Sequence, residues 1–232
     1  MERLGLGLPK EAIYKQFIPK NEFYRHGEFK KADQRAFIEG IERITLYSQL
    51  TRENTNVAEY KDEERHYREI SIIIVELRDK AFMDNIANLI MTSIPYPMLL
   101  IGIYGEEIIF YTAHHRENKA DKNRTVLGYI YNTGFMEMDS PFIEDISYEN
   151  LNKQNFYTLY DSYVQAILSY NLEKRNIKSF ENREEVFKEV NRIEEEIAEF
   201  RSRLKSEKHF NKQIDLNIEI KRLEKKLKDL EG

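Results

Sequence analysis

The sequence predicts an α+β protein: a mixed sheet of four to six strands with covering helices, followed by a C-terminal antiparallel helical hairpin. Three observations predict this class. The run "REISIIIVEL" (Arg68–Leu77) is β-branched and continuous, as expected for a buried central strand. Helical and strand-like apolar periods alternate through the first three quarters of the chain. From Glu181 onward the apolar residues follow a heptad spacing instead.

These observations divide the chain into two parts. We expect an α+β globular domain with an N-terminal arm over residues 1–175, and a coiled-coil helical hairpin over residues 181–232. Hydrophobic residues make up 41% of the chain, which is enough for a core, and the charged fraction of 33% is typical of exposed helices.

The first half of the globular domain is expected to run from the arm through a helix into the sheet. Pro9 and Pro19 interrupt the residues before position 30, whose scattered apolar side chains suit an arm lying on a core. Asp33 is a candidate N-cap for a helix over Asp33–Ile44. Alternating residues predict a short strand over Thr45–Leu50, ahead of the central strand.

The second half of the domain adds two helices and at least three strands. An amphipathic helix is expected over Asp84–Ile94, since the prolines of "PYP" stop it. Two strands then follow, "MLLIGIYG" and "EIIFYTAHHR", joined by a hairpin turn at Gly105–Glu106. A further strand-like run, "VLGYIYNTGF", precedes a helix over Leu159–Tyr170.

The tail carries two series of apolar residues, each spaced alternately by four and three as in a coiled coil. The first is Val186, Val190, Ile193, Ile197, Phe200 and Leu204, and the second is Leu216, Ile220, Leu223, Leu227 and Leu230. The gap between the two series fits neither a continued heptad frame nor a tolerated insertion. The stretch "SEKHFNKQIDLN" between them therefore marks a break, where two helices turn back on each other.

Charge supports the hairpin. Residues Glu181–Phe200 carry eight acids and three bases, whereas Arg201–Lys228 carry ten bases and four acids. An antiparallel fold lays the acidic helix along the basic one, which selects the orientation. The alternative is one long kinked helix that pairs with a second chain, since neither Gly nor Pro interrupts the stretch.

Composition excludes several classes of function. The chain has no Cys, so disulfides and thiolate chemistry are excluded. Its apolar runs are far shorter than the roughly 20 residues of a membrane span, and no N-terminal run resembles a signal peptide. We therefore expect a cytoplasmic protein with no membrane contact and no cofactor. The net charge of −5 means that nucleic acid would have to bind at a local patch.

Five segments, in this order, resemble a known family: "GLPK", "IPKNEFY", "FIEGIERITLYSQLTRENTNV", "IPYPMLLIGIYGEEIIFY" and "LKSEKHFNKQIDLNIEIKRLEKKL". They are distributed over nearly the whole chain and resemble the bacterial family called domain of unknown function 4391. The resemblance implies no established reaction. It implies a context, as a companion of DNA methyltransferases and superfamily-two helicases in restriction or phage-defence gene clusters.

One enzymatic hypothesis is a divalent-metal-dependent nuclease of the restriction type. Glu42 on the first helix, with Glu76 and Arg78 at the end of the central strand, follows the order of elements in such enzymes. Mg²⁺ would then be the cofactor. Arg78 stands where a Lys is expected and is a poor proton acceptor, so such a site would be degenerate. The alternative is a Glu and an Arg at a solvated strand end.

A second candidate site is a basic loop. Arg116, Lys119, Lys122 and Arg124 could hold a nucleic-acid strand together with nearby tyrosines, namely Tyr104, Tyr111, Tyr129 and Tyr131. The alternative is a solvated loop above core tyrosines. His114 and His115 are adjacent, so on a strand they point to opposite faces and cannot easily share a metal. We expect both to be exposed at a strand end.

The tail supplies the candidate partner-binding residues: Phe210, Ile214, Lys221, Arg222 and Lys225. The hypothesis that follows is a non-catalytic accessory subunit of a DNA restriction or phage-defence system, which docks a helicase or methyltransferase and can contact DNA. The nuclease is one alternative. The other is a self-associating structural protein, with a homodimer formed through the C-terminal helices.

Overall fold

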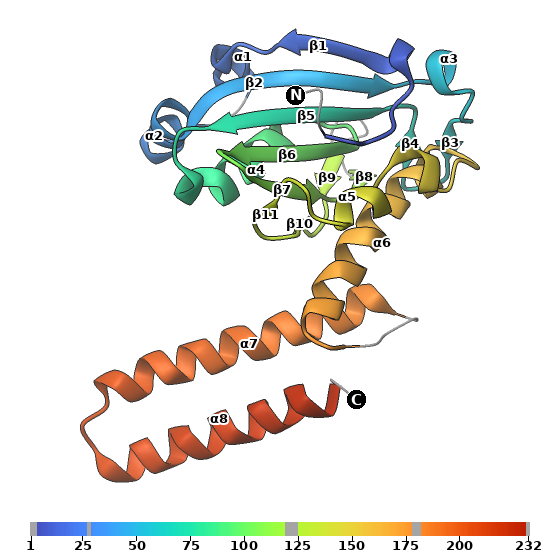
Figure 1. Cartoon of the computed structure of the whole chain (residues 1–232). Coiled ribbons are helices and arrows are strands. Elements are labelled where there is room, and N and C mark those ends of the chain that lie inside the picture. Colours follow the sequence, from blue (N-terminus) through green and yellow to red (C-terminus); the bar gives the residue numbers. More distant parts are fainter. Residues whose placement is uncertain (1–3, 27–28, 119–124, 178–181, 231–232) are drawn as a thin grey trace. The chain divides into compact units, whose positions relative to one another are not determined.

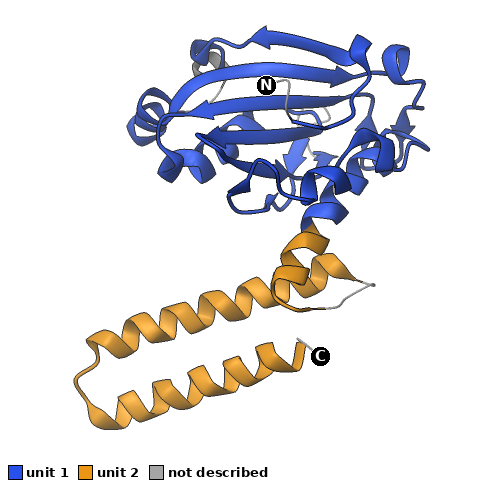
Figure 2. Ribbon diagram, viewed as in Figure 1, with its two compact units in different colours: residues 1–167 blue, residues 168–232 orange. Residues whose placement is uncertain are grey.

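A computed structural model describes residues 4–26, 29–118, 125–177 and 182–230 (Figure 1). The chain divides into two compact units, residues 1–167 and residues 168–232 (Figure 2). The division falls within helix α6 (Phe156–Lys174), so a single helix belongs to both units. No helix among the described residues combines the length and the apolar character needed to cross a membrane.

The first unit is built on a mixed sheet of seven strands, which confirms the predicted class and exceeds the expected four to six strands. The sheet order is β1-β2-β5-β6-β7-β10, and β11 also pairs with β7. The bounds are β1 Ile13–Phe17, β2 Ile41–Leu50, β5 Ile70–Leu77, β6 Met98–Tyr104, β7 Glu107–Thr112, β10 Tyr131–Asn132 and β11 Met136–Glu137. Only β5 and β6 are parallel among these strands; the other pairs are antiparallel.

Strand β5 lies inside the sheet and is buried along its length except at Glu76, which confirms the prediction of a central strand. The parallel partner β6 requires a crossover connection, and helix α4 (Met83–Ser93) supplies it. Ile86, Ile90 and Met91 of α4 are fully buried against one face of the sheet. On the other face, Phe110 of β7 packs on Phe142, 5.7 Å between ring centroids. Both faces of the centre are therefore covered, and the β-branched run is explained.

Short elements complete the first unit. Two small sheets are formed by β3 (Tyr60–Lys61) with β4 (His66–Tyr67), and by β8 (His115–Glu117) with β9 (Thr125–Leu127). The short helices are η1 (Lys10–Ala12), α1 (Lys20–His26), α3 (Arg52–Thr55), η2 (Lys80–Phe82), α5 (Phe142–Asp145) and η3 (Tyr148–Asn150). The predicted strand-like run after the loop is therefore divided between β9 and β10.

The expected helix over Asp33–Ile44 was wrong in its extent, and Glu42 lies on a strand. Helix α2 covers Lys31–Gly40, with the Asp33 carboxylate accepting a hydrogen bond from the Lys30 amide at 2.9 Å. From Ile41 onward the chain pairs with β5, because sheet hydrogen bonds outweigh a weak helical period. A side chain at Gly40 would collide with Phe82, so this boundary fits only glycine.

The expected N-terminal arm is found only in the first part of this segment, where Leu4 and Leu6 are buried in irregular chain, because Ile13–Phe17 forms the sheet's edge strand β1. Lys15 in β1 has φ +53°, in the left-handed region, and the pairing register with β2 shifts between Ile13 and Gln16. Tyr14 and Phe17 are exposed. The edge strand is therefore bulged, and its ladder of hydrogen bonds to β2 is interrupted near the cationic residue Lys15.

The second unit contains helix α7 (Arg183–Ser206) and helix α8 (Phe210–Leu230), which pack antiparallel and confirm the predicted hairpin (Figure 1). Ile193 and Ile197 of α7 are buried with Ile220 and Leu223 of α8. Charged pairs join the same two helices: Arg201 with Glu224 at 2.7 Å, and Lys226 with Glu189 at 2.5 Å. The break between the helices occupies three residues, so Phe210–Asn217 is helical.

Candidate functional site

One face of α8 carries large apolar side chains away from the hairpin seam. Phe210, Ile214 and Ile218 follow one another at intervals of four, so they share one face of the helix. They are 72%, 43% and 57% exposed. Lys221 and Lys225 continue the same face at intervals of three and four, and both are exposed. We call these five residues the outer stripe.

The outer stripe has no acidic member, although acids are common elsewhere on the tail. Lys221 and Lys225 form no ion pair with a described residue. Arg222, predicted with them as a partner-binding residue, points elsewhere and pairs with Glu219 at 2.8 Å. Of the five predicted partner-binding residues, the structure therefore brings together four: Phe210, Ile214, Lys221 and Lys225.

A second candidate site is a cavity of about 210 Å³ in the first unit. Arg116 of β8 lines this cavity. The other lining segments are Arg65, His66 and Arg68, in and beside β4, and Pro95–Pro97, which follows α4. His115, Tyr67, Glu117 and Thr125 complete the lining. Arg116 was predicted for nucleic-acid binding, and we call this cavity the arginine pocket. The other predicted members of that loop, Lys119, Lys122 and Arg124, lie outside the described residues.

The three arginines of the pocket keep most of their hydrogen-bond donors free. Arg65 approaches Asp62 and Glu64 at 3.7 Å each, and Arg68 approaches Glu59 at 3.7 Å, which are ion-pair distances too long for hydrogen bonds. Arg116 forms neither kind of contact with any residue that the structure describes. Guanidinium N–H groups therefore remain available to a ligand acceptor.

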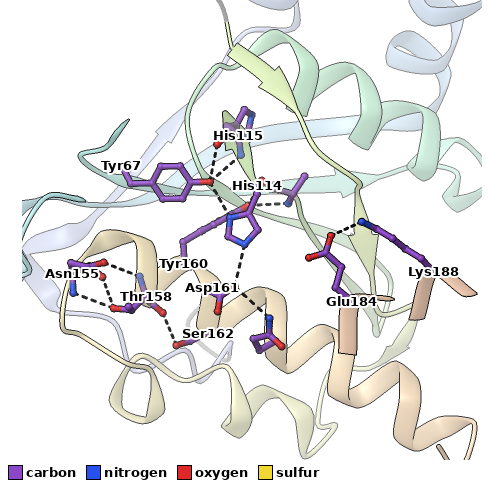
Figure 3. Close-up of polar contacts among 12 residues, drawn as sticks. Tyr67, His114, His115, Asn155, Thr158, Tyr160, Asp161, Ser162, Glu184 and Lys188 are labelled. Atoms are coloured by element: carbon purple, nitrogen blue, oxygen red, sulfur yellow. Dashed lines mark hydrogen bonds and ion pairs between the residues drawn. The ribbon is translucent and has the colours of Figure 1, made fainter. Parts of the chain in front are cut away.

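Behind the pocket, a polar network crosses from a strand end to α6 (Figure 3). His114 lies between the Tyr67 hydroxyl, 3.0 Å from Nδ1, and Asp161 Oδ1, 3.1 Å from Nε2. Tyr67 also accepts a hydrogen bond from the His115 amide at 3.0 Å. The Tyr160 hydroxyl lies 2.9 Å from the Met98 carbonyl and 3.0 Å from the Ala113 carbonyl, and it accepts a hydrogen bond from the Ala113 amide. This network fixes the backbone that presents His115 and Arg116 to the pocket.

The expectation that both histidines are exposed was wrong. His114 keeps 20% of its side-chain surface and stacks on Tyr67 and Tyr157. His115 is only 4% exposed, and neither ring nitrogen has a hydrogen-bond partner among the described residues. Burial lowers the pKa of His115 to about 4, despite the nearby carbonyls of Met91 and Ile94. Sequence reasoning missed this burial because the residues that bury His115 are remote in the chain.

The aromatic residue at the arginine pocket is not one of the four predicted tyrosines. Tyr111 and Tyr131 belong to the core, whereas Tyr104 and Tyr129 are exposed but do not line the pocket. Tyr96 lines it and is 50% exposed. The sequence offered one signal for it: an aromatic residue between two prolines that cannot continue the helix before it.

The proposed nuclease residues do not form an assembled centre. Arg43 faces Glu76 across the sheet, and Glu42 lies in the bulge between the pairs Ile41–Leu77 and Arg43–Glu76. Arg78 donates a hydrogen bond to the Ile38 carbonyl at 3.3 Å, near the end of α2. Within the described residues, no three His, Asp or Glu side chains converge in a way that could hold a metal ion.

These features define a class: an α+β domain with an arginine-lined pocket, followed by a helical hairpin with one exposed apolar face. Comparison with known proteins then gives the family. A family model described as "Domain of unknown function (DUF4391)" matches residues 6–227, so the chain belongs to this family. No curated protein and no solved structure matches the chain.

Proposed function

We propose that this chain is a non-catalytic accessory subunit which docks a DNA helicase or methyltransferase of a bacterial restriction or phage-defence system, in the cytoplasm, through the outer stripe. The family resemblance supports the context. The observation that carries the docking is the exposed row of Phe210, Ile214 and Ile218 on a helix whose seam is already filled. A large apolar row of this kind is characteristic of a surface that meets another helix.

The proposed occupant is an acidic amphipathic helix of the larger enzyme. Its apolar residues would cover Phe210, Ile214 and Ile218, and its carboxylates would meet Lys221 and Lys225. The charges that hold the hairpin together lie elsewhere, since Arg201 and Lys226 are paired with acids of the other helix. Docking therefore leaves the hairpin's own ion pairs in place.

The test is co-expression with each helicase or methyltransferase that the native host encodes near the gene, followed by size-exclusion chromatography and identification of the bound protein. The double variant Phe210→Ser, Ile214→Ser should lose the complex, because each buried side chain contributes about 1.5–3 kcal/mol. Lys221→Glu with Lys225→Glu should weaken it, mainly at low salt. Ile38→Ser is the matched control, since Ile38 is 59% exposed on α2.

Three results would contradict the proposal. The first is a complex that survives both double variants while their helical content is unchanged. The second is a homodimer in light scattering that the Phe210 and Ile214 substitutions abolish, which would assign the stripe to self-association. The third is DNA cleavage with Mg²⁺ or Mn²⁺ that Glu76→Ala removes, which would establish the nuclease alternative.

A further inference from the structure

We propose that the arginine pocket binds one phosphate of single-stranded nucleic acid, with the adjacent base stacked on Tyr96. The proposal does not rest on the docking described above, because all of its residues belong to the first unit. It concerns the body of the protein, and it gives the nucleic-acid contact a defined place and ligand chemistry.

The positive charge of the pocket and its free guanidinium N–H groups favour a phosphate as the bound group. Arg65, Arg68 and Arg116 line the cavity against one acid, Glu117. A planar guanidinium can donate two parallel hydrogen bonds to phosphate oxygens. Three guanidinium groups around a small cavity therefore suit a phosphate.

The size of the cavity points to one group of a larger ligand. A volume of about 210 Å³ is below the range of roughly 300–1,000 Å³ that is typical for whole small molecules. It suits a phosphate held inside the cavity while the rest of the nucleic-acid strand stays outside. A polymer whose backbone presents a phosphate at every residue fits this arrangement better than a free nucleotide.

The exposed ring of Tyr96, which lines the pocket, favours a base next to the bound phosphate. The ring is half exposed, and the flanking Pro95 and Pro97 restrict the backbone that carries it. An exposed ring beside an arginine-lined cavity offers a stacking surface next to a phosphate site. Duplex bases are stacked on each other and cannot reach such a ring, so the preferred ligand is single-stranded.

A neighbouring cavity of the same volume restricts where the phosphate can sit. It shares Arg68 and Tyr96 with the arginine pocket, but its other charged residues are Arg52 and three acids: Glu53, Glu59 and Glu69. These acids repel a phosphate. Arg52 is exposed there and provides a matched control, because it is a nearby arginine outside the proposed site.

The experiment measures fluorescence anisotropy of the full chain with labelled oligothymidine and oligouridine of about 12 nucleotides, near the site sizes of such proteins. Binding of either strand, more tightly than a duplex of the same length, is expected. Tyr96→Leu should weaken binding about fivefold or more, since base stacking on an aromatic ring is worth about 1–3 kcal/mol. Arg68→Ala and Arg116→Ala should each reduce the slope of log affinity against log salt by about 0.7.

Arg52→Ala should bind like the unchanged protein, and circular dichroism should show that every variant is folded. The proposal is overturned if neither strand binds, or if duplex binds more tightly. It is also overturned if Tyr96→Leu binds normally, or if Arg52→Ala weakens binding as much as Arg116→Ala. Equal competition by polyglutamate would assign the pocket to acidic peptides instead, and would overturn it as well.

Discussion

The imidazole of His114 and the carboxylate of Asp161 meet at 3.1 Å, and this contact joins the end of strand β7 to helix α6. The two residues are 47 positions apart in the sequence. The His114 ring also lies 5.5 Å from that of Tyr160, which is fully buried one residue before Asp161. The polar contact therefore sits at the rim of an aromatic cluster and sets how α6 rests on the sheet.

Removing the carboxylate should destabilise the first unit. Asp161→Ala leaves His114 Nε2 without its acceptor, and we expect the free energy of unfolding to fall by about 1 kcal/mol because the pair is partly exposed. Chemical denaturation monitored by tyrosine fluorescence measures this. Asp145→Ala, at an exposed position on α5, is the control and should change stability little. A loss as small for Asp161→Ala as for the control would show that the contact contributes nothing.

Acidification should weaken the first unit through His115. Burial lowers its pKa in the folded protein to about 4, whereas the unfolded value is about 6.5, so the unfolded chain binds more protons between these values. The stability contributed by the neutral ring is complete above about pH 6.5 and is lost as the pH falls towards 4. We expect a decrease of about 1–2 kcal/mol in unfolding free energy between pH 7 and pH 5.

The matched variants for this pH dependence are His115→Gln and His66→Gln. The first removes the titrating ring, so its unfolding free energy should change much less over the same pH interval. His66 is partly exposed beside Glu59, and its variant should keep the dependence of the unchanged protein. A pH profile that His115→Gln leaves unaltered would exclude His115 as its source.

The hairpin should have an acid transition of its own. Hydrogen bonds from Arg192, and to a smaller extent from Lys226, lower the pKa of Glu189 to about 2, from an ordinary value of 4.5. The stabilisation is present above about pH 4.5 and is lost as the pH falls towards 2. Helical ellipticity should therefore decrease over that interval, less so at high salt. In Glu189→Gln this decrease should be smaller, while Glu199→Gln, at an exposed α7 position, should retain it.

Gly102 in β6 should tolerate no side chain. A Cβ atom there would lie 2.8 Å from Ile109 Cγ2 and 2.9 Å from Met83 Sδ. Because β6 is parallel to β5 and α4 packs over it, overpacking at this point strains the crossover itself. We expect Gly102→Ala to lower the melting temperature, with a cost of about 1–3 kcal/mol. An unchanged melting temperature would mean that α4 moves away without cost.

The periodic parts of the fold could be predicted from the sequence. Strand β5, helix α4, the β6–β7 hairpin and the two tail helices each have an apolar pattern that indicates their secondary structure. The boundary between α2 and β2 could not be predicted. It depends on Lys20 and Arg78, which are remote in sequence and donate hydrogen bonds to carbonyls at the end of α2 and the start of β2.

The two candidate sites also differ in how far the sequence could predict them. The outer stripe follows from helical spacing, so Phe210 and Ile214 could be named in advance. The arginine pocket needs three separate segments to meet, and only Arg116 was recognisable beforehand. Arg65 and Arg68 stand in a stretch rich in acids, where nothing local separates a ligand-binding arginine from a solvated one.

The bulge at Lys15 has a consequence for the protein at high concentration. An open sheet edge offers unpaired amides and carbonyls to any other extended chain, and this is a common starting point for fibrils. At β1 the left-handed backbone of Lys15 interrupts the row of amides and carbonyls, since the pairing register shifts between Ile13 and Gln16. An incoming strand would also have to desolvate the ammonium group of Lys15. We therefore expect growth of the sheet from one molecule to the next to be disfavoured at β1, even though Tyr14 and Phe17 remain exposed on that strand.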